Sequence, residues 1–361
     1  MSEQNLVFPA RVLRGAGVIH QLGEICRELG QRALLIGGHQ AIKAVESQVR
    51  TQLADAEVTL LGCEWFGGET SLAQIQRLGE LATSLNVEVI IAAGGGKSLD
   101  TCKAVGAEHN LPVITIPTIA ATCSAVTPLT IRYDDNGNFH DIFPLSQAPA
   151  AVIIDSELLA QAPLRWLSAG LGDTLAKWYE FRAVSQRHPP VDASARSSLA
   201  HSQICYEVIA QHGPKACEAV RKNLPDYHLD QALDAIFTYA GLTSLMSNGA
   251  HAAAAHAIYE GFTFCDKTRE FGHGLLVAYG NLCLLALENR PDEELLHEMA
   301  LARQCGVPLT LKEIADLTDE ELAIIVRESV HAPDMENMAH PVTVEALYQA
   351  IRRVEALAVG R

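Results

Sequence analysis

The first 160 residues alternate short apolar segments with amphipathic ones, and this alternation restricts the fold more than any other feature of the 361-residue chain. Apolar runs of this length predict buried strands, whereas the segments between them have helical spacing and polar outer faces. Strands that alternate with helices form a parallel sheet with helices on its faces. The predicted strands are residues 33–38, 58–63, 89–96, 112–118 and 150–156, and the clearest helices are residues 42–56 and 71–86. We therefore expect an α/β, doubly wound domain of a nucleotide-binding kind.

The strand signals end near Pro163, and the rest of the chain is rich in Ala and Leu with Gly, Pro and Asn between helical segments. The segments 202–211, 231–246 and 274–288 are predicted to be packed core helices, since each is too short and too interrupted to cross a membrane. The chain should thus comprise two domains, an α/β domain over residues 1–162 and an all-α domain over residues 163–361.

The charge balance narrows the possible partners. The chain has 27 basic and 43 acidic residues, for a net charge of −16, which argues against a nucleic-acid or anionic-membrane surface and favours a small-molecule partner. Its start has no charged segment followed by an apolar run, so we expect a cytoplasmic protein. The nine cysteines form no Cys-x-x-Cys pair and are predicted to be reduced thiols, mostly in the core.

Three consecutive glycines, Gly94, Gly95 and Gly96, follow a predicted strand and precede a helical segment. Without Cβ atoms, the backbone N–H groups of such a turn can approach a pyrophosphate, and Ser98 adds a hydroxyl. The run fits neither Gly-x-Gly-x-x-Gly nor the Walker A pattern, and a tight turn without a ligand is the alternative. A second loop, residues 117–123, should lie at the same edge of the sheet, where ligands bind in open α/β folds.

The end of the first predicted strand, Gly37-Gly38-His39, has no carboxylate to bind a ribose 2′-hydroxyl. The cofactor choice between NAD and NADP is therefore open. His39 or Lys43 is placed to meet a 2′-phosphate, although a solvated loop histidine is the commoner case.

Asp173, His256 and His273 lie far apart in the sequence, in segments that together suit one divalent-metal site. One carboxylate and two imidazoles hold a metal and leave a position open for a substrate oxygen, as Lewis-acid catalysis requires. Taken singly, an aspartate at a helix start is usually a cap, and a histidine in an Ala-rich helix is usually an ordinary core or surface residue.

Six ordered blocks spread over nearly the whole chain resemble those of the iron-containing (metal-dependent, group III) alcohol dehydrogenases, in particular the glycerol dehydrogenase branch. The blocks are residues 67–71, 94–104, 117–139, 172–180, 253–262 and 273–280. The resemblance implies the fold shared with dehydroquinate synthase, with a nucleotide domain, a helical domain and a metal in the cleft between them. It implies a homo-oligomer as well.

Carried over by position, the resemblance implies that Asp173, His256 and His273 are the metal ligands. The metal in this branch is commonly zinc, with iron or manganese in relatives. The resemblance also assigns residues 94–98 to the pyrophosphate, and Thr118 and Thr122 to the adenine and ribose side. It places Ser124, Thr127 and Leu129 nearer the nicotinamide. The full set of predicted cofactor-binding residues is Gly38, Gly94, Gly95, Gly96, Lys97, Ser98, Asp100, Thr118, Thr122, Ser124, Thr127, Leu129 and Tyr133.

The chain departs from the family pattern at several positions near the predicted chemistry, including Leu275 and Leu276, which replace polar residues after the last ligand histidine and make that wall of the pocket drier. Cys123 stands where glycerol dehydrogenases have an aspartate that positions a polyol hydroxyl. Tyr259 replaces a second histidine of the metal segment and is predicted either to donate a proton or to pack. Lys177 stands where relatives with a four-ligand site have a histidine, so a three-ligand, open site fits this chain better.

Cys123 together with residues 173–180 resembles a subgroup that includes a hydroxycarboxylate dehydrogenase acting on 2-oxo acids with NADPH. A cysteine in place of an aspartate removes a negative charge that would repel a substrate carboxylate. The electrostatic change therefore favours the same substrate class as the resemblance does. Arg132 or Lys177 is a candidate to pair with that carboxylate, and a surface ion pair is the alternative for each.

The sequence thus predicts a metal-dependent NAD(P)(H) oxidoreductase that transfers a hydride between nicotinamide and a small carbonyl compound, with a 2-hydroxy acid and 2-oxo acid as the expected pair. Glycerol or another polyol is the alternative substrate. A cyclase like dehydroquinate synthase would need many basic phosphate-binding side chains, and the chain has few near its predicted ligands. A non-catalytic NAD or metal sensor is the other alternative, but it has no evident use for an open metal site.

Overall fold

The computed structural model describes residues 6–134, 139–247 and 251–359. The chain divides into two compact units: Met1–Pro163 with Ala219–Gly241, and Leu164–Glu218 with Leu242–Arg361. We describe each unit by itself. The predicted division at residues 162 and 163 remains a prediction, and the units differ from it in one segment, since residues 219–241 belong with the first.

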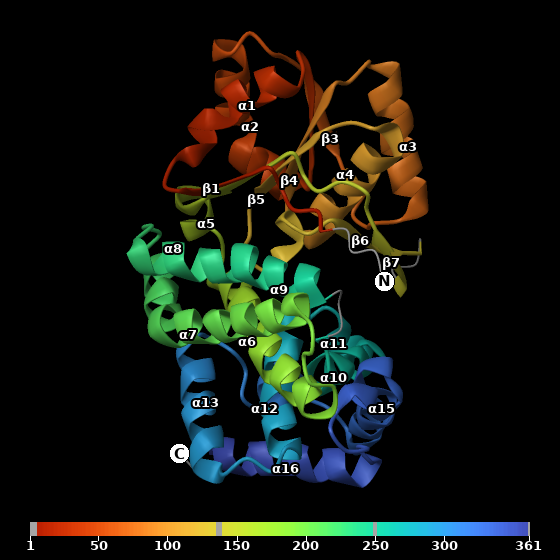
Figure 1. The fold of residues 1–361 in the computed structure, drawn as a ribbon, viewed down its shortest axis with the longest axis vertical. Helices are drawn as coiled ribbons and strands as arrows, with labels where there is room; N and C mark the ends of the chain where they lie inside the picture. The colour runs from red at the N-terminus through yellow and green to blue at the C-terminus, as the bar shows by residue number, and fades with distance from the viewer. Residues whose placement is uncertain (1–5, 135–138, 248–250, 360–361) are drawn as a thin grey trace. The chain divides into compact units, whose positions relative to one another are not determined.

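The first unit is built on a six-stranded parallel sheet with the strand order β1-β8-β5-β4-β2-β3 (Figure 1). Its strands are β1 (Arg11–Gly15), β2 (Arg32–Gly37), β3 (Thr59–Trp65), β4 (Val89–Gly94), β5 (Val113–Pro117) and β8 (Ala151–Asp155). Chain order reverses between β2 and β4, because β3 lies on one side of β2 and the later strands lie on the other. Loops that leave the carboxyl ends of β2 and β4 therefore diverge, and such a switch point is where open α/β sheets bind ligands.

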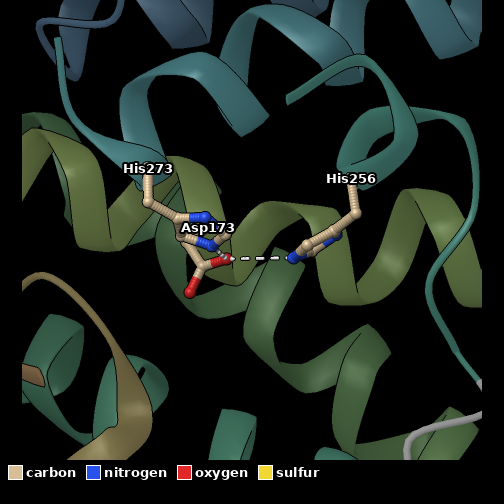
Figure 2. A group of neighbouring side chains, drawn as sticks. All are labelled: Asp173, His256 and His273. Carbon is tan, nitrogen blue, oxygen red and sulfur yellow. Dashed lines mark ion pairs between the residues drawn. The ribbon is translucent and has the colours of Figure 1, made fainter. Parts of the chain in front are cut away.

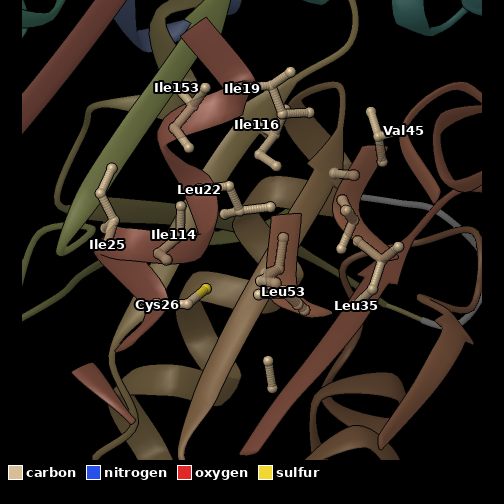
Figure 3. Packing of buried hydrophobic residues seen from close by; sticks show 14 of the residues in the cluster. Ile19, Leu22, Ile25, Cys26, Leu35, Val45, Leu53, Ile114, Ile116 and Ile153 are labelled. Carbon is tan, nitrogen blue, oxygen red and sulfur yellow. The ribbon is translucent and has the colours of Figure 1, made fainter. Parts of the chain in front are cut away.

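Helices cover both faces of this sheet (Figure 1). On one face, α1 (Leu22–Leu29) and α2 (His39–Asp55) contribute side chains such as Leu22 and Leu53 to a buried cluster with sheet residues such as Leu35 and Ile114 (Figure 3). The pair α3 (Leu72–Ser84) and α4 (Gly96–His109) pack together on the other face. Because successive strand residues point to opposite faces, fully buried runs in β2, β4 and β8 give each face an apolar layer.

All five predicted strands are present, and the predicted helices at 42–56 and 71–86 correspond to α2 and α3, with ends that differ by one to three residues. The sequence did not predict β1 or the antiparallel hairpin of β6 (Leu129–Tyr133) and β7 (Phe139–Pro144). Both carry arginines or other polar residues and are only partly buried where described, so their apolar signal is weak. The C-terminal part of the first unit is α8 (Tyr227–Leu233) and a π-helix, η3 (Asp234–Tyr239), attached to β1 by Arg14, which pairs with Asp230 and Asp234 at 2.9 and 2.8 Å.

Every regular element among the described residues of the second unit is a helix, as predicted. The principal ones are α6 (Leu164–Arg187), α7 (Ala193–Arg221, which runs on into the first unit), α9 (Ala240–Ser247), α10 (Ala254–Thr263), α12 (His273–Leu287), α13 (Asp292–Gln304), α15 (Asp319–His331) and α16 (Val344–Val359). Helix α12 is the core element, since all but two of its fifteen residues are buried. No helix in the described part of the chain is both long and apolar enough to span a membrane. None of the nine cysteines forms a disulfide bond with another described residue, and eight of them are buried.

Candidate functional site

Three side chains from three helices of the second unit converge on one point (Figure 2). Asp173 lies on α6, His256 on α10 and His273 at the first position of α12. The Asp173 Oδ1 atom is 3.6 Å from His256 Nε2 and 3.4 Å from His273 Nε2. Their ligand atoms all lie within 4.8 Å of one another, and no other three His, Cys, Asp or Glu side chains in the described part of the chain meet this closely. The structure thus brings together the three residues predicted to share a metal site.

Close packing between α6 and α12 fixes two of these residues. A Cβ atom at Gly172 would lie 2.3 Å from the Ala278 Cβ, and one at Gly274 would lie 2.2 Å from the Ala169 carbonyl oxygen. Only glycine fits either contact, because side-chain atoms do not approach so closely. Asp173 follows Gly172 and His273 precedes Gly274, so the helix crossing itself sets the separation of the two side chains.

Glu180 orients His256. Its Oε2 atom is 2.6 Å from His256 Nδ1, and its Oε1 accepts the backbone N–H groups of Ala253 and His256 at 2.8 and 2.9 Å. The Glu180 side chain is fully buried. A carboxylate on one imidazole nitrogen leaves the other nitrogen to a metal, an arrangement common behind metal-binding histidines. We did not predict Glu180; its spacing of seven residues from Asp173, two turns along the same helix face, is the signal that points to it.

The Asp173 carboxylate is buried, and its Oδ1 atom has no hydrogen-bond partner. Burial raises the pKa of Asp173, but Lys177, His256 and His273 outweigh that effect and hold it well below the usual value. Burial lowers the pKa of His256, yet the carboxylates of Glu180 and Asp173 raise it overall to about 10. Lys177 and the two histidines therefore stabilise the charged form of the Asp173 carboxylate.

Lys177 lies one turn after Asp173 on α6 and is buried. Its Nζ atom is 3.1 Å from Nε2 of His251, whose Nδ1 is 2.9 Å from the Ser247 hydroxyl. Burial and the charge of Lys177 hold the pKa of His251 well below its usual value, so the imidazole is neutral and accepts from the ammonium. Lys177 thus places a positive charge close to the Asp173 site, whereas His251 was not predicted.

Tyr259 packs edge-to-face against His273, with ring centroids 4.2 Å apart. Burial, followed by the charges of Glu260 and Asp173, raises the pKa of Tyr259 to about 12, so the phenol is neutral at physiological pH. Of the two predicted roles, this contact supports packing.

The glycine loop of the first unit connects β4 to α4. Gly94 has φ +151°, and Gly95 approaches the second loop so closely that a Cβ atom would lie 2.6 Å from Ile119 Cδ1. The second loop is tied to the first by the Thr118 N–H, which donates to the Gly94 carbonyl at 3.0 Å. The two loops therefore leave adjacent strands side by side at the carboxyl edge of the sheet. Ser98 is buried and its hydroxyl donates to the Ala93 carbonyl, so only its backbone N–H remains for a cofactor.

Asp100 and Lys103 of α4 hold residues 124–129, the segment that follows the second loop. The Lys103 ammonium, with a side chain only 1 % exposed, donates to the carbonyls of Ser124, Thr127 and Leu129 at 2.8, 3.0 and 2.6 Å. Asp100 pairs with Lys103 at 2.9 Å, and accepts from the Ser124 hydroxyl at 2.5 Å. Irregular buried loops need such donors for their carbonyls. Asp100 thus supports this segment, as does Lys103, which we did not predict as a site residue.

The remaining predicted residues lie around the same edge. Thr122 caps the short helix η2 (Cys123–Ala125), and Gly38 precedes α2. The Lys97 ammonium pairs with Glu69 at 2.7 Å and lies 5.4 Å from the centre of the Tyr133 ring. Arg132 forms the predicted alternative, an ion pair, with Asp141 of β7 at 2.6 Å. Cys123 is buried in η2.

Comparisons with known proteins agree with this architecture. The family model described as iron-containing alcohol dehydrogenase matches residues 9–156. A glycerol dehydrogenase of Pseudomonas putida is 34% identical over 95% of this chain and 94% of its own length, and hydroxycarboxylate dehydrogenase A of Escherichia coli K12 is 30% identical over 97% of each. The crystal structure of a probable glycerol dehydrogenase from Sinorhizobium meliloti has a TM-score of 0.85 at 27% identity, covering 99% of this chain and all of that one.

The fold and these relatives define an oxidoreductase that acts on CH–OH groups. The chain belongs to the iron-containing alcohol dehydrogenase family, as its sequence blocks predicted. This family is NAD(P)-dependent and metal-binding.

Proposed function

We propose that this protein is a divalent-metal-dependent NAD(P)(H) oxidoreductase whose metal is held by Asp173, His256 and His273. The observation that carries the proposal is the buried Asp173 Oδ1, which has no hydrogen bond and faces two imidazole nitrogens at 3.4 and 3.6 Å. Ligand atoms about 2.0–2.2 Å from a tetrahedral zinc ion lie roughly 3.3–3.6 Å apart, so these separations fit one cation. One carboxylate and two imidazoles suit zinc first, and iron or manganese next.

The cation supplies Lewis acidity toward a substrate oxygen, and the dinucleotide supplies or accepts the hydride. The chain's own residues then have distinct tasks. Glu180 holds the His256 ring with Nε2 toward Asp173, and Tyr259 packs against His273 to keep that ring in place. In the first unit, residues 94–98 would bind the pyrophosphate through backbone N–H groups, and the loop supported by Lys103 would bind the nicotinamide side.

For the substrate we propose a small 2-hydroxy acid and its 2-oxo acid. The buried, uncharged Cys123 stands where glycerol dehydrogenases have an aspartate, which removes a charge that would repel a carboxylate. Lys177 adds a positive charge close to Asp173. Arg132 is occupied by Asp141, so Lys177 is the better candidate to attract a carboxylate.

Glycerol or another small polyol is the second candidate. The glycerol dehydrogenase of Pseudomonas putida is more similar in sequence, at 34% identity, than the hydroxycarboxylate dehydrogenase, at 30%. A cytoplasmic location, a homo-oligomeric state and the lack of nucleic-acid or membrane partners remain predictions from the sequence.

The test is a kinetic panel with NADH and NADPH on the zinc-, iron- and manganese-loaded protein. The panel compares the reduction of small 2-oxo acids with that of dihydroxyacetone, and the oxidation of 2-hydroxy acids with that of glycerol. We expect 2-oxo acids to be reduced with the higher kcat/KM and Cys123→Asp to shift that preference toward polyols. Efficient turnover of polyols alone would contradict the substrate assignment.

The metal assignment is tested separately. His256→Ala should lose the bound metal and at least about 10³ in kcat/KM, because several kcal/mol of transition-state stabilisation depend on the cation. His297→Ala, on an exposed position of α13, is the matched control. A His256→Ala protein that keeps one metal per chain and full activity would refute the site.

A further inference from the structure

The carboxyl end of β2 lies next to the glycine loop, on the other side of the switch point. Gly37 of β2 pairs with Ala93 of β4, immediately before Gly94. A Cβ atom at Gly37 would lie 2.6 Å from the Ala93 carbonyl oxygen, so the two strand ends are in direct contact. A dinucleotide whose pyrophosphate sits on residues 94–98 would extend its adenosine ribose toward a neighbouring strand end, and the end of β2 is one of the two neighbours.

This strand end has no carboxylate. Gly37 and Gly38 are followed by His39 and Gln40, and the first turn of α2 contains no acidic residue. Proteins that prefer NAD place an Asp or Glu at the corresponding position, where it accepts hydrogen bonds from the ribose hydroxyls and repels a 2′-phosphate. The end of β2 in this protein has no carboxylate to bind the ribose hydroxyls or to repel a 2′-phosphate.

A histidine and a lysine follow the end of β2 instead. His39 and Lys43 are one turn apart on α2, both exposed, and residues at this spacing share a helix face. The His39 ring stacks nearly parallel on Trp65 of β3, with ring centroids 5.1 Å apart and 12° between the planes. The stack holds the imidazole at the end of the sheet, and Trp65, 43% exposed, extends a flat apolar surface beside it.

The local charges also favour an anion, although the chain as a whole is strongly acidic. Three carboxylates of α2, β3 and the segment after β3 each have a cation of their own: Glu46 pairs with Arg50, Glu64 with Arg77 and Glu69 with Lys97. Lys43 forms no ion pair with any residue that the structure describes. An unpaired ammonium beside a fixed imidazole is suited to a doubly charged phosphate.

We infer that His39 and Lys43 form a binding site for the 2′-phosphate of NADP(H), with Trp65 as its wall, and that this protein uses NADP(H) in preference to NAD(H). The inference rests on the proposed nucleotide site at residues 94–98. Lys43 contributes charge, and His39 contributes an N–H donor whose ring is kept in place by Trp65.

The experiment compares two probes that lack nicotinamide, adenosine 2′,5′-bisphosphate and adenosine 5′-monophosphate, by calorimetric titration of the full-length, metal-loaded protein. They differ only in the 2′-phosphate. We expect the bisphosphate to bind at least about tenfold more tightly at low salt, with an advantage that shrinks as salt is added. Lys43→Met should remove most of that advantage, whereas Lys222→Met, also an exposed lysine of the first unit, should not.

A second variant tests the same site in the opposite direction. His39→Asp places a carboxylate at the end of β2, so it should lower the ratio of kcat/KM for NADPH to that for NADH by at least about tenfold. Both positions are exposed, so thermal unfolding should be unchanged. Equal binding of the two probes would overturn the 2′-phosphate site while leaving the nucleotide site standing. If neither probe binds, the proposed nucleotide site and this inference both fail, independently of the metal centre.

Discussion

The proposed nucleotide edge of the first unit and the proposed metal centre of the second differ in how their polar groups are satisfied. At the nucleotide edge, Ser98, Asp100 and Lys103 all have partners within the unit, so the loops are held before any ligand arrives. In the metal centre, Asp173 Oδ1 is buried without a hydrogen bond. The first site offers backbone groups on loops that are already supported, whereas the second is a set of side chains that we propose to bind one cation.

This difference predicts two kinds of mutational response. Side-chain substitutions beneath the nucleotide loops should reduce folding stability first, because those side chains support the backbone. Substitutions around the metal centre should reduce metal affinity first and leave the helices folded, since α6 and α12 are held together by their own packing.

The largest effect is expected for Lys103→Met. The change leaves the buried Asp100 carboxylate without its cation and three loop carbonyls without a donor, at a cost of about 3–5 kcal/mol in the free energy of unfolding. Urea denaturation measures it, with Lys222→Met as the control. The double variant Asp100→Asn, Lys103→Met should recover part of the loss, because no isolated charge remains. If Lys103→Met left the free energy of unfolding unchanged, the nucleotide loops would not depend on side-chain support. The two sites would then not differ in their response to substitution.

A smaller effect is expected for Glu180→Gln. An amide retains the shape of the side chain, but its NH₂ group cannot accept all three N–H bonds that the carboxylate now accepts. Loss of such an orienting partner should weaken metal affinity by about 10- to 100-fold, measured by competition with a chelator. Glu207→Gln, on an exposed position of α7, is the control. If chelator competition shows no change while unfolding stability falls sharply, Glu180 is a structural residue rather than an orienting one.

The smallest effect is the pH dependence of metal binding. Because Glu180 and Asp173 outweigh burial and raise the pKa of His256 to about 10, the metal-free site holds a proton at neutral pH that the metal must displace. Apparent affinity should therefore rise by about tenfold per pH unit between pH 7 and 8.5. Calorimetry in two buffers of different ionisation enthalpy counts the released proton. An affinity independent of pH in this range would show that His256 is already deprotonated.

The two regions also differ in how far the sequence predicted them. The glycine loop and the loop after β5 are contiguous motifs, and the alternation of strands and helices places both at one sheet edge. Lys103 escaped notice because a lysine in an apolar helix carries no local sign that three distant carbonyls will surround it. The hairpin of β6 and β7 was missed for a similar reason, since its weak apolar pattern becomes a pair of strands only through cross-strand contacts.

By itself, the sequence determined the α/β and all-α halves, the family and the three residues that converge in the second unit. These follow from periodicity and from ordered blocks, which are local properties of the chain. Only the tertiary structure decided what surrounds those residues: Glu180 behind His256, the lysine and histidine pair beside Asp173, and the tryptophan that holds His39. Each of these depends on the distance between side chains from separate elements, and helix packing and strand order fix that distance, whereas sequence separation does not.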